Sequence, residues 1–375
     1  MKNSTRREFR KTAGAISAIA LMVTGVAAQA APTSLISGLG ITPTPLITAG
    51  APPDTPTTRI DPNEPTSPFS GVVSINIRYD GLSYICSGAA ISPWHVLTAG
   101  HCVDTNGQGS VIDLNKPGND VRVVFNSESA AGADGHSIIT ANQVTMNPNY
   151  QGFGVCPPGV NSFCVNDDIA ILRLPRAIPL SSKWYKLSNQ QLAQGSVITM
   201  AGYGTSGDGW NGYNVSPAFR VKRSGKNVYD FADHDDEAGF DPNSPDEVWY
   251  ADFDGTGPDG TVYDSFCDPS VLGVAVCGAS LGNDVETNIG GGDSGGPSFI
   301  NDGSGNLLLV ANNTFGFHLD TGLPKGGFGD GMGGVLLYSY LDWIRATAVP
   351  EPGTLALLGL GLLGIGATQR RRLSA

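Results

Sequence analysis

The chain has 375 residues and a formal net charge of −12, with 34 acidic and 22 basic side chains. This acidic balance argues against nucleic acid or an anionic membrane surface as a partner. The length allows one large domain or two small ones, and the six cysteines, none of them in a Cys-x-x-Cys pair, favour disulfides over a metal site. We therefore expect no metal and no cofactor.

Residues 1–30 have the features of an export signal. A basic stretch with the pair Arg6-Arg7 precedes a small and apolar run over 12–26, and Ala28-Gln29-Ala30 fits the pattern cut by signal peptidase. The arginine pair resembles a twin-arginine signal, and an ordinary secretory signal is the alternative. Both predict an exported chain. The next residues, 31–58, are rich in Pro, Thr, Gly and Ala, so we interpret them as a linker or propeptide.

Short strands are predicted from residue 72 onward. Alternating apolar residues over 72–79, the turn pair Asp80-Gly81 and a second apolar run over 84–91 predict a hairpin. Helical spacing occurs only near the end, where Leu337, Leu341 and Ile344 share one face. Further short apolar runs lie at 121–125, 169–174, 196–202 and 307–311. This pattern favours an all-β fold, an antiparallel barrel or sandwich with one closing helix.

A stretch of different composition covers residues 205–266. It carries many aspartates among glycines and prolines, so we expect an acidic insertion on the surface. Within it, Asp252-Phe253-Asp254-Gly255 offers carboxylates to calcium but lacks the spacing and terminal Glu of an EF-hand loop. We interpret the segment as a solvated loop and leave calcium binding open.

Three short motifs, in chain order, point to chemistry. His101 follows an apolar run and precedes Cys102, Asp168 opens an apolar strand, and Ser294 lies in Gly-Asp-Ser-Gly-Gly-Pro at 292–297. A serine hydroxyl becomes a good nucleophile only when a neighbouring base accepts its proton. The last motif also fits the Gly-x-Ser-x-Gly elbow of α/β-hydrolases, but that fold needs an acid and then a histidine after the serine, and Pro297 stands where its helix should start. An esterase of that class is therefore the weaker alternative.

The motifs Thr98-Ala99-Gly100-His101-Cys102, Asp168-Ile169-Ala170 and 292–297 resemble those of the chymotrypsin-like (trypsin-like) serine proteases. The resemblance implies that Ser294 is the nucleophile, that His101 is its general base and that Asp168 orients the imidazole. It also implies an oxyanion hole formed by the backbone N–H groups of Gly292 and Ser294.

The same resemblance implies a fold and a function for residues 59–348. The expected fold is two antiparallel six-stranded β-barrels with a short C-terminal helix. The expected function is that of an exported serine endopeptidase, which hydrolyses a polypeptide substrate through a covalent acyl-enzyme. A catalytically idle binding protein of the same fold is the alternative. The other four histidines, His95, His136, His234 and His318, have no comparable setting, so we expect them to be structural or on the surface.

Specificity and activation depart from the family pattern. Asn288 takes the place at the base of the primary pocket, so a preference for Arg or Lys is disfavoured. Thr314-Phe315-Gly316 resembles the segment that pairs with the substrate backbone, and Gly333-Gly334 is expected to leave the pocket open. Family zymogens are cut before an Ile-Val-Gly-Gly terminus whose amine pairs with the aspartate preceding the nucleophile. Arg59-Ile60 is the only plausible cut site of that kind, yet Asp61-Pro62 follows it in place of Val-Gly, so the sequence leaves open whether it is an activation cut.

Three disulfides are expected. The Cys86–Cys102 pair follows from the family motif, and it would pin the loop that presents His101. The other two pairs, Cys156–Cys164 and Cys267–Cys277, rest on sequence proximity alone.

The C-terminal segment 349–375 combines Pro-Glu-Pro, an uncharged run over 355–367 and three arginines at 370–372. This arrangement resembles the PEP-CTERM sorting tail of Gram-negative bacteria, which an exosortase removes, so we expect export to the cell surface or beyond. The alternative is a plain membrane anchor. A transmembrane helix here would be short, because the run from 353 to 368 spans only about 24 Å as a helix. Contact with the membrane through this tail is expected to be transient.

Overall fold

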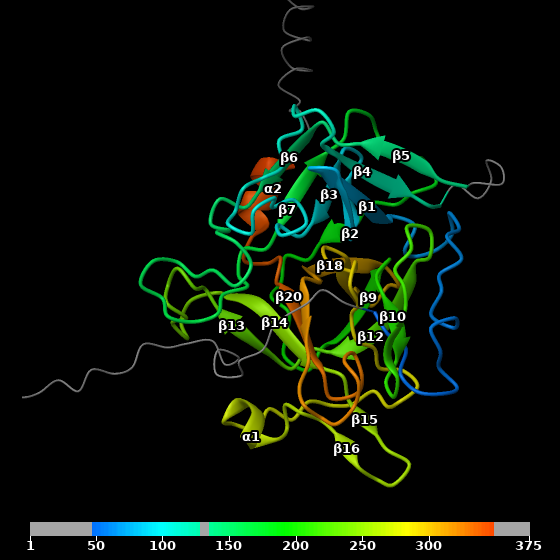
Figure 1. Ribbon diagram of the computed structural model, residues 1–375, viewed down its shortest axis with the longest axis vertical. Coiled ribbons are helices and arrows are strands. Elements are labelled where there is room, and N and C mark those ends of the chain that lie inside the picture. The colour runs from blue at the N-terminus through cyan, green and yellow to red at the C-terminus, as the bar shows by residue number, and fades with distance from the viewer. Residues whose placement is uncertain (1–46, 128–134, 349–375) are drawn as a thin grey trace, which may run out of the picture. The chain divides into compact units, whose positions relative to one another are not determined.

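The computed structural model describes residues 47–127 and 135–348 of the chain. Short antiparallel strands dominate this part, and its helices are α1 (Pro269–Leu272) and α2 (Leu341–Thr347) (Figure 1). The all-β expectation is therefore confirmed. In α2, Leu341 and Ile344 are buried, as the apolar spacing predicted, whereas Leu337 precedes the helix.

The first barrel is a sheet whose strands are ordered β5-β4-β1-β2-β3-β7-β6. Strands β5 and β6 are separated only by Ala141 and Asn142, and they pair with β4 and β7 at the two ends of the sheet. The ring of pairings is therefore complete. If β5 and β6 are counted as one bent strand over 137–146, the first barrel has six strands. The strands are β1 (Val72–Tyr79), β2 (Leu82–Ser92), β3 (His95–Thr98), β4 (Asp120–Phe125), β5 (Ser137–Thr140), β6 (Gln143–Met146) and β7 (Ala170–Arg173).

The expected hairpin between β1 and β2 is present. Tyr79 pairs with Leu82, and both turn residues, Asp80 and Gly81, have positive φ, as a two-residue hairpin of this kind requires. Ile75 and Ile77 point into a core that includes Val121 and Val123 of the neighbouring strand β4. The alternating apolar pattern thus fills the barrel interior.

The second barrel is assembled from two sheets, ordered β12-β9-β17-β18-β8 and β13-β14-β20-β19. Only Tyr229 and Asp230 separate β12 from β13, and the bridge between Ala311 and Leu336 joins the second sheet to the end of β18. These links complete a second ring through β9, β17, β18, β20, β14 and the bent strand 223–234.

The strands of the second barrel are β8 (Lys186–Leu187), β9 (Val197–Gly202), β12 (Arg223–Val228), β13 (Phe231–His234), β14 (Asp246–Asp252), β17 (Pro297–Asn301), β18 (Leu307–Asn312), β19 (Phe315–Phe317) and β20 (Gly331–Val335). Two small hairpins flank it, β10 (Ser206–Asp208) with β11 (Gly212–Val215) and β15 (Gly255–Thr256) with β16 (Val262–Tyr263).

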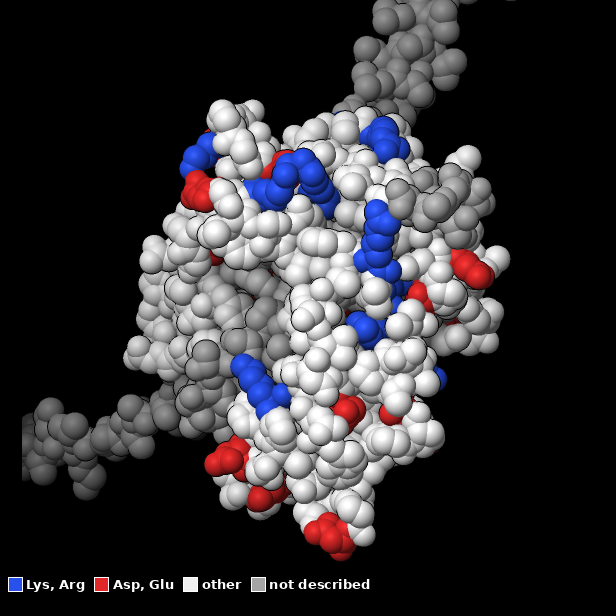
Figure 2. Space-filling view, turned by 45° about the vertical axis from the view of Figure 1, so that its right-hand side comes forward, with Lys and Arg blue, Asp and Glu red and all other residues white. Residues whose placement is uncertain are grey.

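The expectation of a surface insertion over 205–266 is wrong for much of that stretch. Strands β12, β13 and β14 belong to the second barrel, and Trp249 and Tyr250 on β14 are fully buried. Several of the aspartates are buried as well, including Asp236, Asp252 and Asp254. On the face drawn in Figure 2, acidic side chains form small separate groups and no continuous patch. The aspartate-rich composition concealed the strands because the acids flank or follow the apolar positions.

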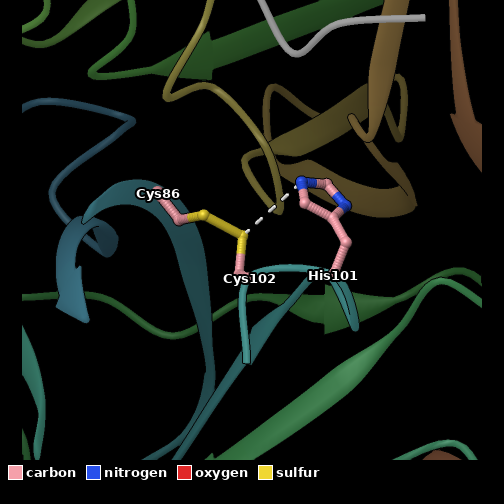
Figure 3. A group of neighbouring side chains, drawn as sticks. All are labelled: Cys86, His101 and Cys102. Atoms are coloured by element: carbon pink, nitrogen blue, oxygen red, sulfur yellow. Dashed lines mark hydrogen bonds between the residues drawn. A yellow bond between two sulfur atoms is a disulfide. The ribbon is translucent and has the colours of Figure 1, made fainter. Parts of the chain in front are cut away.

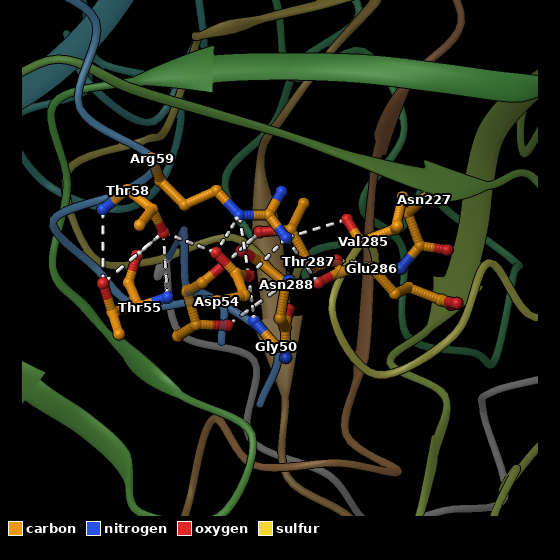
Figure 4. Close-up of polar contacts among 11 residues, drawn as sticks. Gly50, Asp54, Thr55, Thr58, Arg59, Asn227, Val285, Glu286, Thr287 and Asn288 are labelled. Atoms are coloured by element: carbon orange, nitrogen blue, oxygen red, sulfur yellow. Dashed lines mark hydrogen bonds and ion pairs between the residues drawn. The ribbon is translucent and has the colours of Figure 1, made fainter. Parts of the chain in front are cut away.

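The segment that begins at Ile47 is part of the folded domain, so the expected linker does not extend to residue 58. Ile47, Ala49 and Ala51 are buried, and their N–H groups bond to Thr205, Gly207 and Asn283 respectively. Figure 4 shows how the rest of the segment is held.

In that segment, Asp54 accepts hydrogen bonds from Gly50 N and from the Arg59 guanidinium. The Arg59 guanidinium also donates to the Val285 and Glu286 carbonyls, at 2.8 and 3.2 Å. These contacts fasten the segment to the loop that leads to Asn288 (Figure 4).

All three expected disulfides are present: Cys86–Cys102, Cys156–Cys164 and Cys267–Cys277. Among the described residues, no helix is long and apolar enough to cross a membrane. The C-terminal run that suggested a transmembrane helix lies outside the described residues, so the structure does not support that expectation.

Neighbouring residues on β9 allow a test of this core. Ile198 is 0% exposed within the second barrel, whereas Val197 beside it is 46% exposed. We expect Ile198→Ala to lower the free energy of unfolding by about 2–5 kcal/mol, because it removes buried methyl groups and leaves a cavity. Val197→Ala should change it by no more than about 0.5 kcal/mol. Urea unfolding of both variants measures the difference, and equal losses would contradict the assignment of the two faces.

Candidate active site

Strand pairing brings His101 and Asp168 together. Strand β3 ends at Thr98, which pairs with Ala170 at the start of the antiparallel strand β7, so the residues that follow β3 lie beside those that precede β7. His101 Nδ1 lies 2.6 Å from Asp168 Oδ2, and the His101 backbone N–H donates to Asp168 Oδ1 at 2.7 Å. Asp168 is fully buried. The carboxylate thus orients the ring with Nδ1–H toward itself, which leaves Nε2 free to accept a proton.

The Cys86–Cys102 disulfide lies beside His101 (Figure 3) and also contacts the backbone of Ser294. Cys102 Sγ is 3.9 Å from His101 Nε2 and 3.7 Å from the Ser294 carbonyl oxygen. The same carbonyl accepts a hydrogen bond of 2.8 Å from Ser87 N on β2. Because both sulfurs are covalently paired, the grouping of Cys86, His101 and Cys102 is not a metal site.

The Ser294 hydroxyl is buried and has no hydrogen-bond partner among the described residues. A hydrogen bond between His101 and the Ser294 hydroxyl is therefore not formed in this structure. Such bonds are commonly long or poorly aligned until substrate is bound. The hydroxyl is left without competing partners.

Backbone geometry around Ser294 depends on two glycines. Gly292 has φ +102° and Gly295 has φ +77°, which side-chain-bearing residues rarely adopt. A Cβ at Gly295 would lie 2.2 Å from Thr98 Oγ1. Ser87 Oγ donates to the Gly292 carbonyl at 2.8 Å, and no hydrogen bond within the described residues occupies the N–H of Gly292 or of Ser294. Two free donors therefore flank the Ser294 side chain.

Asp293 is fully buried and accepts hydrogen bonds from three backbone N–H groups. The donors are Gly204 at 2.8 Å, Gly290 at 2.7 Å and Ile47. Burial raises the pKa of this carboxyl to about 7. The structure thus places Ile47, and not Ile60, against the aspartate that precedes Ser294.

The structure does not place Ile60, the residue after the cut site considered from the sequence, against Asp293. Ile60 is 41% exposed, and its backbone forms an antiparallel β-bridge with Arg223. The Arg59 side chain forms a salt bridge with Asp54. A signal for the alternative was present, since Ile47-Thr48-Ala49-Gly50 also begins with Ile and ends in small residues. Ile60 follows a basic residue, Arg59, whereas Ile47 follows Leu46.

The expected specificity residues have different surroundings in the structure. Asn288 is buried, and its side-chain oxygen accepts from Ile289 N at 2.8 Å, while its backbone carbonyl accepts from Thr48 N at 2.6 Å. Thr314 N donates to the Gly333 carbonyl, and Phe315 and Gly316 belong to β19, the last strand of its sheet.

The expectation that Gly333 and Gly334 leave open space is not supported. A Cβ at Gly333 would lie 2.6 Å from the Phe315 ring, and one at Gly334 would lie 1.9 Å from the Asn312 carbonyl oxygen. These glycines permit close packing of the strands.

Sequence analysis missed the aromatic neighbour of His101. The Phe153 ring lies 5.5 Å from the His101 ring and 6.1 Å from the Phe315 ring, in both cases edge-on. The Cys156–Cys164 disulfide follows Phe153 in the same loop. The spacing of those cysteines was the available signal that this loop has a fixed shape.

The remaining histidines have structural partners, as expected. Their contacts are His95 with Ser92, His234 with Asp246, His318 with Asp330 and His136 with Arg220.

Comparisons with known proteins agree with this geometry. Residues 60–226 match the Trypsin family, and residues 348–372 match the PEP-CTERM protein-sorting motif. Brachyurin from Leptuca pugilator is 29% identical over 128 residues, which are 33% of this chain and 47% of brachyurin, so the chain spans about half the length of this curated relative. A solved structure, the scabies mite inactivated protease paralogue S-I1, aligns at 20% identity over 74% of this chain and 94% of its own, with a TM-score of 0.41. Residues 60–226 are thus similar to the trypsin-like serine proteases, and the C-terminal residues 348–372 match the PEP-CTERM sorting motif.

Proposed function

We propose that the protein is an exported serine endopeptidase with the triad His101, Asp168 and Ser294. The observation that carries this proposal is the 2.6 Å contact between His101 Nδ1 and Asp168 Oδ2. The Ser294 hydroxyl has no partner among the described residues, and Cys102 Sγ contacts both His101 Nε2 and the Ser294 carbonyl. The family match supports the same assignment. The α/β-hydrolase alternative is not favoured, because the strands around Ser294 are antiparallel and β17 (Pro297–Asn301) follows it in place of a helix.

In the proposed mechanism, Ser294 Oγ attacks the carbonyl carbon of the scissile peptide while His101 Nε2 takes its proton. The carbonyl oxygen becomes an oxyanion, which the N–H groups of Gly292 and Ser294 stabilise. His101 then gives the proton to the departing amine, leaving an acyl ester on Ser294 that water hydrolyses. Asp168 stays ionised throughout and stabilises the imidazolium.

The substrate proposed is a polypeptide bound in extended form. Strand β19 pairs with β20 on one side only within the described sheet, so its other edge can accept a substrate strand. Asn288 carries no charge to pair with Arg or Lys. We therefore propose cleavage after uncharged side chains.

The first test removes the nucleophile. Ser294→Ala should abolish labelling by a fluorophosphonate probe and nearly all hydrolysis of an unfolded protein substrate, because no other group can form the acyl ester. Asp168→Asn should lower kcat by about 10⁴ through the wrong imidazole tautomer. Ser304→Ala, at an exposed serine between β17 and β18, is the matched control and should keep full activity.

Two results decide between the candidate functions. Folded protein that fails to react with the probe and does not hydrolyse peptides would indicate the idle binding protein. Unchanged hydrolysis in Ser294→Ala would overturn the triad.

We further propose that the enzyme is activated by a cut between Leu46 and Ile47. The Ile47 nitrogen already contacts the buried Asp293 carboxylate, whose pKa is raised because burial disfavours its charge. A cut would turn this neutral N–H into an ammonium, which stabilises the ionised carboxylate. The resulting pair would hold the 290–294 turn and with it the oxyanion donors.

N-terminal sequencing of the active exported enzyme should therefore find Ile47 as the first residue. Asp293→Asn should lower activity by about 10² or more, because a small displacement of the 290–294 turn misplaces the nucleophile. Asp320→Asn, an exposed site, serves as the control. An active enzyme that starts at Ile60 would contradict the proposal, since Ile47 would then be absent.

The location proposed is the surface of a Gram-negative bacterium or the medium, after the tail has been processed by an exosortase-type peptidase. The PEP-CTERM match supports this proposal.

Intact mass measurement of the exported protein tests the sorting proposal. We expect the dominant form to lack the residues after the Pro-Glu-Pro sequence, because a run this short and rich in glycine is a poor permanent anchor. A dominant surface form that still ends at Ala375 would instead indicate a plain anchor.

A further inference from the structure

A group of carboxylates, here called the Asp254 cluster, gathers below β14 in the second barrel. Carboxylate oxygens of Asp252, Asp254 and Asp264 all lie within 4.8 Å of one another. Asp252 ends β14, Asp254 follows it, and Asp264 follows β16. Asp230 and Glu286 complete the cluster as the nearest further acids that act on Asp254. Five residues from four separate segments thus converge on one place.

Backbone amides hold most of these carboxylates in fixed orientations. Asp252 accepts from Phe266 N at 3.0 Å, and Asp264 accepts from Cys267 N at 2.9 Å. Glu286 accepts from Leu281 N at 2.7 Å. The Cys267–Cys277 disulfide then closes the loop directly behind Asp264. The cluster is therefore built into the fold and is not a chance meeting of mobile side chains.

Asp254 differs from its neighbours because one of its carboxylate oxygens is buried without a donor. The residue is 6% exposed, and its Oδ1 is buried without a hydrogen-bond partner among the described residues. The charged groups around it are all carboxylates, those of Asp252, Glu286, Asp264 and Asp230. A buried oxygen with no donor, surrounded by acids, is strongly unfavourable unless a cation balances it.

We propose that Asp252, Asp254 and Asp264 bind a calcium ion, with Asp230 and Glu286 adding negative charge around it. The available ligands are all oxygens, which excludes a preference for the softer metals that favour sulfur or nitrogen. Calcium accepts six to eight oxygens in irregular geometry, whereas magnesium requires a near-ideal octahedron. An uneven set of fixed carboxylates suits the larger ion.

The site is connected to the substrate-binding region through Glu286. This residue stands two positions before Asn288, and its carbonyl together with that of Val285 holds Arg59 (Figure 4). The backbone of Glu286 also forms an isolated parallel β-bridge with Lys226 of β12. Bound calcium would therefore stabilise both the loop that carries Asn288 and the docking of the 50–59 segment.

A second acidic group lies elsewhere and must be distinguished from this one. Asp167, Asp236, Glu237 and Glu247 also bring carboxylate oxygens within 4.8 Å of one another. Because this group is adjacent to Asp168, a test that measured only activity would confuse the two places. The experiment below therefore measures binding of the ion directly.

The exported chain, stripped with EGTA and returned to calcium-free buffer, is titrated with CaCl2 by calorimetry and with TbCl3 by luminescence. Tyr263, next to Asp264, should sensitise the terbium emission. We expect saturable binding and a rise in Tm with calcium. Asp254→Asn should raise the dissociation constant at least about tenfold, because it removes a charged ligand. Asp259→Asn is the matched control, since Asp259 is an exposed aspartate between β15 and β16.

The outcomes separate the alternatives. Because Asp254→Asn relieves repulsion, it should fold and gain stability in calcium-free buffer while losing the calcium-dependent rise in Tm. Asp264→Asn, at a more exposed ligand, should show the same loss of affinity and covers the case in which the first variant does not fold. Absence of calcium binding in the parent chain would overturn the proposal. Binding that is lost in Asp236→Asn but retained in Asp254→Asn would overturn it too. These readouts do not depend on peptidase activity, so they stand apart from the triad proposal.

Discussion

The buried carboxylate of Asp293 is the contact on which the rest of the site depends. It accepts hydrogen bonds from Ile47, from Gly204 just beyond β9, and from Gly290 in its own turn. These three donors come from segments far apart in the chain, and each is a backbone group whose position is fixed by neighbouring structure. The carboxylate therefore couples the beginning of the folded domain to the turn that carries Ser294.

The two barrels supply different parts of the site, and a disulfide of the first barrel lies at the contact between them. His101 and Asp168 come from the first barrel, whereas Ser294 and its flanking glycines come from the second. The Cys86–Cys102 disulfide contacts both His101 and the Ser294 carbonyl, and Ser87 bonds to the carbonyls of Gly292 and Ser294. Residues 86–87 of strand β2 thus set the position of Ser294 relative to His101.

The acidic character of the chain has an internal as well as a surface component. Asp168 and Asp293 are buried beside specific donors, and each serves a defined position in the site. Asp254 is buried without such a donor. A net charge deduced from composition does not distinguish these cases, because burial and hydrogen bonding decide whether a carboxylate is stabilised or left in need of a cation.

The sequence alone determined the all-β class, the β1–β2 hairpin, the disulfide partners and the three residues of the candidate triad. Alternating apolar residues, turn pairs, local cysteine spacing and short motifs are all encoded over a few positions, so they can be recognised without a fold. Only the tertiary structure decided that 205–266 contributes barrel strands, that Ile47 and not Ile60 meets Asp293, and that Phe153 lies against His101. Each of these depends on contacts between residues distant in the chain, and whether an aspartate is solvated or buried is a property of the assembled barrel, not of the aspartate's neighbours in sequence.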